Sequence, residues 1–100
     1  MKPTEALLEK TEEIKRLIET YGFTELKLFG SAARGDDNEG SDLDLLVTIP
    51  PAMAGKISLF DIAELEDELQ ALLGVPVDLH IYNNMPEHLR QAIESEMIEL

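Results

Sequence analysis

Residues 42–49 (DLDLLVTI) set two aspartates into an otherwise apolar run, and this pattern restricts the fold more than any other segment. Successive side chains of a β-strand point to opposite faces, so Asp42 and Asp44 share one face, about 6.6 Å apart along the strand. Leu43 and Leu45 then point to the other face, into a hydrophobic core. The segment therefore predicts a sheet with one buried face and an acidic position on the opposite face.

Hydrophobic periodicity in the rest of the chain predicts helices that cover this sheet. Leu7, Ile14 and Ile18 recur at helical spacing within 4–21, which predicts an amphipathic helix. The other elements expected on similar grounds are, in chain order, a strand at 24–29, a short helix within 30–35, a strand at 42–49, a helix at 58–73, a strand at 75–81 and a helix from 84 onward. We expect an α/β (α+β) fold over 1–100 as a single domain, in the order αβ(α)βαβα, with a small mixed sheet of three or more strands.

Residues at the expected helix ends agree with these boundaries. Ser58 begins a capping-box signature for the helix at 58–73. For the first helix, Thr4 is the expected N-cap and Gly22 the residue that ends it. Asn84 and Glu87 have the spacing that would cap the last helix.

The chain is strongly acidic, with 21 Asp and Glu against 8 Lys and Arg and a formal charge of −13. Proteins hold nucleic acid largely through Lys and Arg, so this composition argues against direct nucleic-acid binding. It favours a basic or cationic partner, or a small phosphate substrate held through a metal.

No segment approaches the ~20 apolar residues of a membrane span, and residues 1–10 lack the apolar core of a secretory signal. We therefore expect a cytoplasmic protein without membrane contact.

The paired aspartates indicate a divalent metal. Asp42 and Asp44 repel each other on one face, and a cation such as Mg²⁺, which prefers oxygen ligands, removes that conflict. Asp78 lies on the polar face of the later apolar strand and is the natural third ligand. His80 shares that face, and we expect it to be a surface or paired group. On the aspartates alone, the solvent face of an edge strand would be the preferred explanation.

The Gly30-Ser31 turn shifts the balance toward a phosphate site. The glycine allows close backbone approach, the amides that follow favour an anion, and the serine adds a hydroxyl donor. The spacing from Gly30 to Gly35 fits a P-loop, but Asp36 and Asp37 stand where that motif needs Lys and Ser or Thr. A calcium loop that starts at either aspartate lacks the glycine at position six and the glutamate at position twelve. Turn and aspartates together indicate phosphoryl or nucleotidyl transfer.

The same residues resemble the minimal nucleotidyltransferases of the DNA polymerase β superfamily. The resemblance rests on a Gly-Ser pair, ten intervening residues, an Asp-x-Asp pair and an aspartate on a later strand, which here are Gly30, Ser31, Asp42, Asp44 and Asp78. It implies a minimal polymerase-β-like fold. It also implies that the three aspartates bind two Mg²⁺ ions and that Gly30 and Ser31 contact the triphosphate of ATP. Asp78 would help deprotonate an acceptor hydroxyl that attacks the α-phosphorus and releases pyrophosphate.

Arg34 matches the family's Gly-Ser-x-Ala-Arg-Gly pattern, either as a phosphate contact or as a brace for the loop. Minimal members are often paired with a HEPN-domain ribonuclease in toxin–antitoxin modules, where they attach AMP to a tyrosine of the toxin. The resemblance thus implies a HEPN-type toxin as partner and an antitoxin role. Two alternatives stay open: transfer to a cationic small molecule, and a non-catalytic antitoxin that masks its partner. Nucleobase preference, oligomeric state and the number of nucleotides transferred stay open as well.

Overall fold

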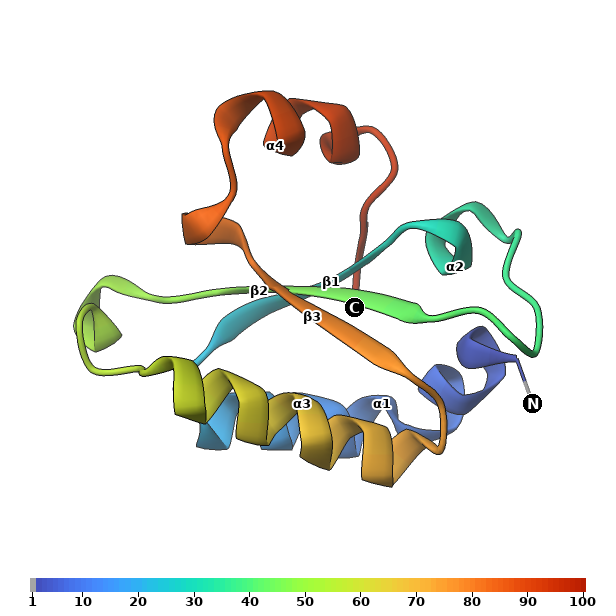
Figure 1. Cartoon of the computed structure of the whole chain (residues 1–100), viewed down its shortest axis with the longest axis horizontal. Coiled ribbons are helices and arrows are strands. Elements are labelled where there is room, and N and C mark those ends of the chain that lie inside the picture. The colour runs from blue at the N-terminus through green and yellow to red at the C-terminus, as the bar shows by residue number, and fades with distance from the viewer. Residues whose placement is uncertain (1) are drawn as a thin grey trace.

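The computed structural model describes residues 2–100 and contains a four-stranded mixed sheet (Figure 1). The strands are β1 (Thr24–Phe29), β2 (Leu43–Thr48), β3 (Val77–Ile81) and β4 (Ile98–Glu99). Their order in the sheet is β3-β2-β1-β4, in which β1 runs antiparallel to β2 and β4, while β2 and β3 are parallel. The expected mixed sheet is confirmed, and β4 extends it by one short strand.

Helices cover both faces of the sheet. In Figure 1, α1 (Pro3–Thr20) and α3 (Leu59–Leu73) lie side by side below the sheet, and α4 (Glu87–Glu94) stands above it. The one-turn helix α2 (Ser31–Arg34) follows β1, and short 3-10 turns occupy Pro51–Met53 and Tyr82–Asn84. Within residues 2–100, none of the helices is both long and apolar enough to cross a membrane.

Strand β2 separates two hydrophobic clusters. On the face toward α1 and α3 it contributes three fully buried side chains, Leu43, Leu45 and Val47. On the opposite face Leu46 is equally buried, in a smaller cluster that includes side chains of α4 and the segment before it. Asp44 shares the Leu46 face but keeps 25% of its side chain exposed. One end of this face is therefore closed by α4, and the aspartate end is accessible.

Strand register decides which polar side chains meet on the accessible part of the sheet. In the parallel β2–β3 pair, Asp44 lies beside Asp78 and Leu46 beside His80. In the antiparallel β1–β2 pair, Phe29 lies beside Asp44 on its other side. Paired residues leave the same face of a sheet, so Asp44 occupies the middle of a row contributed by three strands.

Several predicted helix ends are confirmed. Ser58 is the N-cap of α3, and its capping box with Asp61 is formed in both directions. Gly74 ends α3 with φ +71°, and Gly22, with φ +91°, follows the last turn of α1. Both glycines occupy the left-handed region in which a Cβ is unfavourable.

The N-terminus of α1 differs from the prediction. Thr4 is not the N-cap, because the helix begins at Pro3 and Lys2 holds the cap position. Instead, the Thr4 amide donates to Asp37 Oδ2 at 2.9 Å, and the Thr4 hydroxyl donates to the same oxygen. Asp37 is buried, at 8% exposure, and these hydrogen bonds lower the pKa of its carboxyl. A carboxylate 33 residues downstream thus satisfies the first turn of α1 and anchors the acidic loop.

The C-terminal segment also differs. Asn84 does not cap α4, because it ends a 3-10 turn and Pro86 holds the cap position. The helix stops at Glu94 instead of continuing to the C-terminus. The chain then adds β4 to the outer edge of β1, where the Leu100 amide donates to the Leu26 carbonyl at 3.1 Å. Hydrogen bonds to the exposed edge of β1 outweigh the helical periodicity of these last residues.

Removal of the Asp37 carboxylate should destabilise the protein by about 0.5–2 kcal/mol, as loss of helix-capping side chains does. For a domain of this size, Asp37→Ala should lower Tm by about 4–8 °C per kcal/mol, measured by calorimetry at pH 7. Asp36→Ala is the matched control, because Asp36 makes only an exposed ion pair with Arg34 and should change Tm little. Equal losses in the two variants would contradict the capping role of Asp37.

The pH dependence of the Asp37→Ala deficit follows from the lowered pKa of Asp37. A carboxylate with a depressed folded pKa stabilises the protein above the unfolded pKa of about 3.9, and this contribution disappears as the pH falls through the folded value. The difference in Tm between wild type and Asp37→Ala should therefore shrink below about pH 4.

Candidate active site

Asp44, Asp78 and His80 form a cluster on the α4 face of the sheet. One carboxylate oxygen from each aspartate and one imidazole nitrogen lie within 4.8 Å of one another. His80 Nε2 is 3.4 Å from Asp44 Oδ1. Asp44 is about a quarter exposed and Asp78 is exposed, so the cluster opens to solvent on the Asp78 side. Two carboxylates and an imidazole are a donor set that fits a divalent metal.

Electrostatics at Asp44 also favour a cation. Burial raises the pKa of the Asp44 carboxyl, contact with His80 opposes that rise, and the negative charges of Asp78 and Asp42 add to it. The fold therefore makes ionisation of Asp44 less favourable than in a free aspartate. A bound divalent ion supplies positive charge and offsets both the burial and the repulsion.

Gly30 brings the backbone of the Gly-Ser turn against Asp44. Its φ is +78°, in the left-handed region. A Cβ at this position would stand 3.1 Å from Asp44 Cγ and nearer still to Asp44 Oδ2. Glycine is therefore required both by the backbone angle and by the space that the carboxylate occupies. Gly30 therefore borders the aspartate cluster, and Ser31 follows it directly as the first residue of α2.

Asp42 lies at the edge of the site rather than in the cluster. The strand begins at Leu43, one residue later than predicted, and Asp42 is exposed. For the part of the chain that the structure describes, the group of converging ligand atoms comes from Asp44, Asp78 and His80, with Asp42 outside it. Asp42 is nevertheless close enough for its charge to raise the pKa of Asp44.

Arg34 ties α2 to the segment after α4. Its Nη1 lies 3.0 Å from Glu96 Oε2, and its Nε lies 3.4 Å from Asp36 Oδ2. The Glu96 contact, more than that of Asp36, raises the pKa of the guanidinium. Of the two roles expected for Arg34, these contacts are those of a brace. A phosphate contact would require the guanidinium to leave Glu96.

His80 is the residue whose importance the sequence did not reveal. Its pairing with a carboxylate was expected and is found, but its convergence with both aspartates was not. The ring stacks edge-on against Phe29, with centroids 4.8 Å apart and an interplanar angle of 68°. The available signal was its position two residues after Asp78, which places both on one face of β3.

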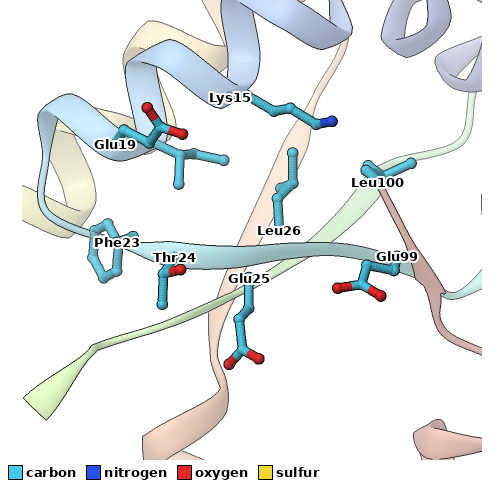
Figure 2. Close-up of a pocket in the computed structure, with 9 residues that line it drawn as sticks. Lys15, Glu19, Phe23, Thr24, Glu25, Leu26, Glu99 and Leu100 are labelled. Atoms are coloured by element: carbon cyan, nitrogen blue, oxygen red, sulfur yellow. The ribbon is translucent and has the colours of Figure 1, made fainter.

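A separate hollow lies on the other side of β1, between that strand, α1 and β4 (Figure 2). Its volume is about 280 Å³, and Lys15, Phe23, Leu26 and Leu100 are among the residues that line it. Figure 2 shows Leu26 pointing toward α1, into the face opposite to that of Asp44. Among the described residues, none that was predicted for the site lines this hollow, so we do not assign it to the nucleotide.

Sequence comparison identifies the family. Residues 9–100 match the nucleotidyltransferase domain family. The protein adenylyltransferase MntA of Thermococcus cleftensis is 35% identical over 96 residues, which cover 91% of this chain and 93% of that protein. The family match includes all the residues that the sequence predicts for the site.

Structural comparison agrees with the sequence. A protein assigned as a minimal nucleotidyltransferase superimposes with a TM-score of 0.82 and 36% identity, over 97% of this chain and 95% of its own. Two toxin–antitoxin structures share the fold. One contains AMP-PNP and superimposes with a TM-score of 0.74 and 23% identity, over 88% of this chain and 69% of that chain. The other is a tri-AMPylated HEPN toxin with its MNT antitoxin from Shewanella oneidensis, with a TM-score of 0.67 and 21% identity, over 94% of this chain and 70% of that chain. The chain therefore belongs to the nucleotidyltransferase domain family, within the DNA polymerase β superfamily, and is a nucleotidyltransferase.

Proposed function

We propose that this protein transfers AMP from ATP to a tyrosine hydroxyl of a HEPN-type toxin and so acts as its antitoxin. The observation that carries the proposal is the Asp44–Asp78 pair beside Gly30, in a chain 35% identical to a protein adenylyltransferase over nearly its whole length. In this proposal residues 1–100 act as a single nucleotidyltransferase domain.

Asp42, Asp44 and Asp78 hold two Mg²⁺ ions in this proposal. When bound, the ions neutralise phosphate charge and activate the attacking and leaving oxygens. The exposure of Asp78 lets an acceptor side chain reach it, and its carboxylate takes the proton of the acceptor hydroxyl. The acceptor oxygen then attacks the α-phosphorus, and pyrophosphate leaves. Asp42, exposed at the rim of the cluster, would supply a further oxygen ligand.

Gly30 and Ser31 hold the triphosphate, the first through its backbone amide and the second through its amide and hydroxyl. Because α2 is a single turn, the anion is held by these local donors rather than by the dipole of a long helix. Arg34 supports nucleotide binding by bracing the turn through Glu96. The toxin–antitoxin structure that contains AMP-PNP supports an adenine nucleotide as the donor.

The formal charge of −13 supports a basic protein partner. A HEPN toxin whose tyrosine lies near basic residues would be drawn to the acidic surface and presented to Asp78. The Shewanella oneidensis complex, with its AMPylated HEPN toxin, supports this class of partner. A purely masking antitoxin would use the same charge attraction without group transfer. The mass of the toxin distinguishes the two mechanisms, because only a catalytic antitoxin adds AMP to it.

Incubation with Mg²⁺, ATP and the HEPN-type product of the adjacent gene should add the mass of AMP to that product, detected by intact mass spectrometry. Asp44→Asn and Asp42→Asn should each reduce the transfer rate at least about 100-fold, as loss of a group that stabilises transition-state charge does. Asp36→Asn is the matched control, an exposed aspartate of the same loop that should transfer normally. If the protein neutralised the toxin without adding mass to it, and Asp44→Asn neutralised the toxin equally well, the protein would be a masking antitoxin instead.

Metal-free Asp44→Asn should melt at a higher temperature than metal-free wild type at pH 7, measured with a chelator present. Burial raises the folded pKa of Asp44, so its ionisation costs stability once the pH has risen through that value. Below the unfolded pKa of about 3.9 the residue is neutral in both states, and the advantage of Asn should vanish. Asp42→Asn should raise Tm by a smaller amount, because Asp42 is exposed. A lower Tm for Asp44→Asn at pH 7 would mean that Asp44 has a stabilising structural partner.

A further inference from the structure

We propose that the cluster of Asp44, Asp78 and His80 binds Zn²⁺ through the His80 imidazole, and binds it more tightly than Mg²⁺. The inference rests on the metal site of the proposed function but concerns which metal that site selects. Zn²⁺ would then compete with the Mg²⁺ that supports nucleotide transfer.

The state of the His80 imidazole is the first argument. Among residues 2–100, His80 Nε2 is one of two buried side-chain polar atoms without a hydrogen-bond partner. It lies 3.4 Å from Asp44 Oδ1, but outside hydrogen-bonding geometry. A buried polar atom without a partner costs free energy, and native structures contain few of them. A metal ion between the nitrogen and the carboxylate would give His80 Nε2 a partner.

The separation of the two atoms is the second argument. Two ligand atoms that each lie about 2.1 Å from one ion are about 3.0 Å apart at an octahedral right angle and about 3.4 Å apart at a tetrahedral angle. The 3.4 Å between His80 Nε2 and Asp44 Oδ1 matches the tetrahedral case, which Zn²⁺ prefers. A carboxylate oxygen of Asp78 belongs to the same group of ligand atoms, which all lie within 4.8 Å of one another, and the Asp78 side chain is exposed to solvent.

The rigidity of the donors is the third argument. All three side chains project from the paired strands β2 and β3. The Phe29 and His80 rings pack in a T-shaped arrangement, which restricts the orientation of the imidazole. The geometry is therefore held by the sheet. Three protein ligands with a fourth position open to solvent are the composition of a zinc site that binds water or substrate.

Ligand chemistry gives the expected selectivity. Imidazole suits zinc and its first-row neighbours, whereas Mg²⁺ prefers an all-oxygen environment and gives up its water reluctantly. A site of three aspartates would favour Mg²⁺. In the converging group of this chain, His80 stands beside Asp44 and Asp78 while Asp42 lies outside it, and the imidazole shifts the preference toward Zn²⁺. It also favours Co²⁺, which adopts the same geometry and reports it by its visible absorption.

The test uses the untagged full chain without nucleotide or toxin, titrated with ZnCl₂, MgCl₂ and CoCl₂. We expect one Zn²⁺ per chain, bound more tightly than Mg²⁺ in calorimetry, and an intense visible Co²⁺ band typical of tetrahedral coordination. His80→Gln should weaken Zn²⁺ at least about tenfold and abolish the Co²⁺ band. His88→Gln is the matched control, because His88 is the chain's other histidine and is exposed on α4.

A wild-type protein that binds Zn²⁺ no more tightly than Mg²⁺, or a His80→Gln variant that binds Zn²⁺ as well as wild type, would overturn the proposal. NMR of the wild-type imidazoles provides a readout that does not depend on the folding of the variant: Zn²⁺ should shift the ring signals of His80 and leave those of His88 in place. Either failure leaves the Mg²⁺-dependent transfer of AMP intact, since that reaction is measured separately with ATP and toxin.

Discussion

The parallel pairing of β2 with β3 is the interaction on which the site depends. It places Asp44 beside Asp78, and it places His80, two residues after Asp78, on the same face beside Leu46. Burial of Leu43, Leu45 and Val47 on the other face fixes this register, because a slip of one residue would turn Asp44 into the core and these side chains toward solvent. The buried leucines and valine of the strand therefore determine where its aspartate lies.

The segment between β1 and β2 completes the site from the other side. Gly30 allows the backbone to approach Asp44 at a distance that any Cβ would prevent. Seven residues later, Asp37 fixes the loop to the first turn of α1 through Thr4. Arg34 adds a second tie, to Glu96. The segment that begins with the Gly-Ser turn is thus held at three points, by Gly30, Arg34 and Asp37.

Local patterns predicted the elements that depend on local interactions. The alternation in β1, β2 and β3, the capping box at Ser58 and the shared face of Asp78 and His80 could all be read from spacing, and the structure has them. Three features could not be read in this way: the capping of α1 by Asp37, the final strand β4 and the convergence of His80 with Asp44. Each depends on a contact between residues distant in the sequence or on strand register, which periodicity does not specify.

The central claim, that the β2–β3 register creates the metal site, is tested most directly by titrating Mn²⁺ into ¹⁵N-labelled protein. Paramagnetic broadening falls steeply with distance from the ion. The account predicts that the amide signals of Gly30, Asp44 and Asp78 broaden first, at low Mn²⁺. Broadening that begins instead on the acidic outer faces of α1 and α3, around Glu13 and Glu68, with the signals of the cluster unaffected, would contradict it.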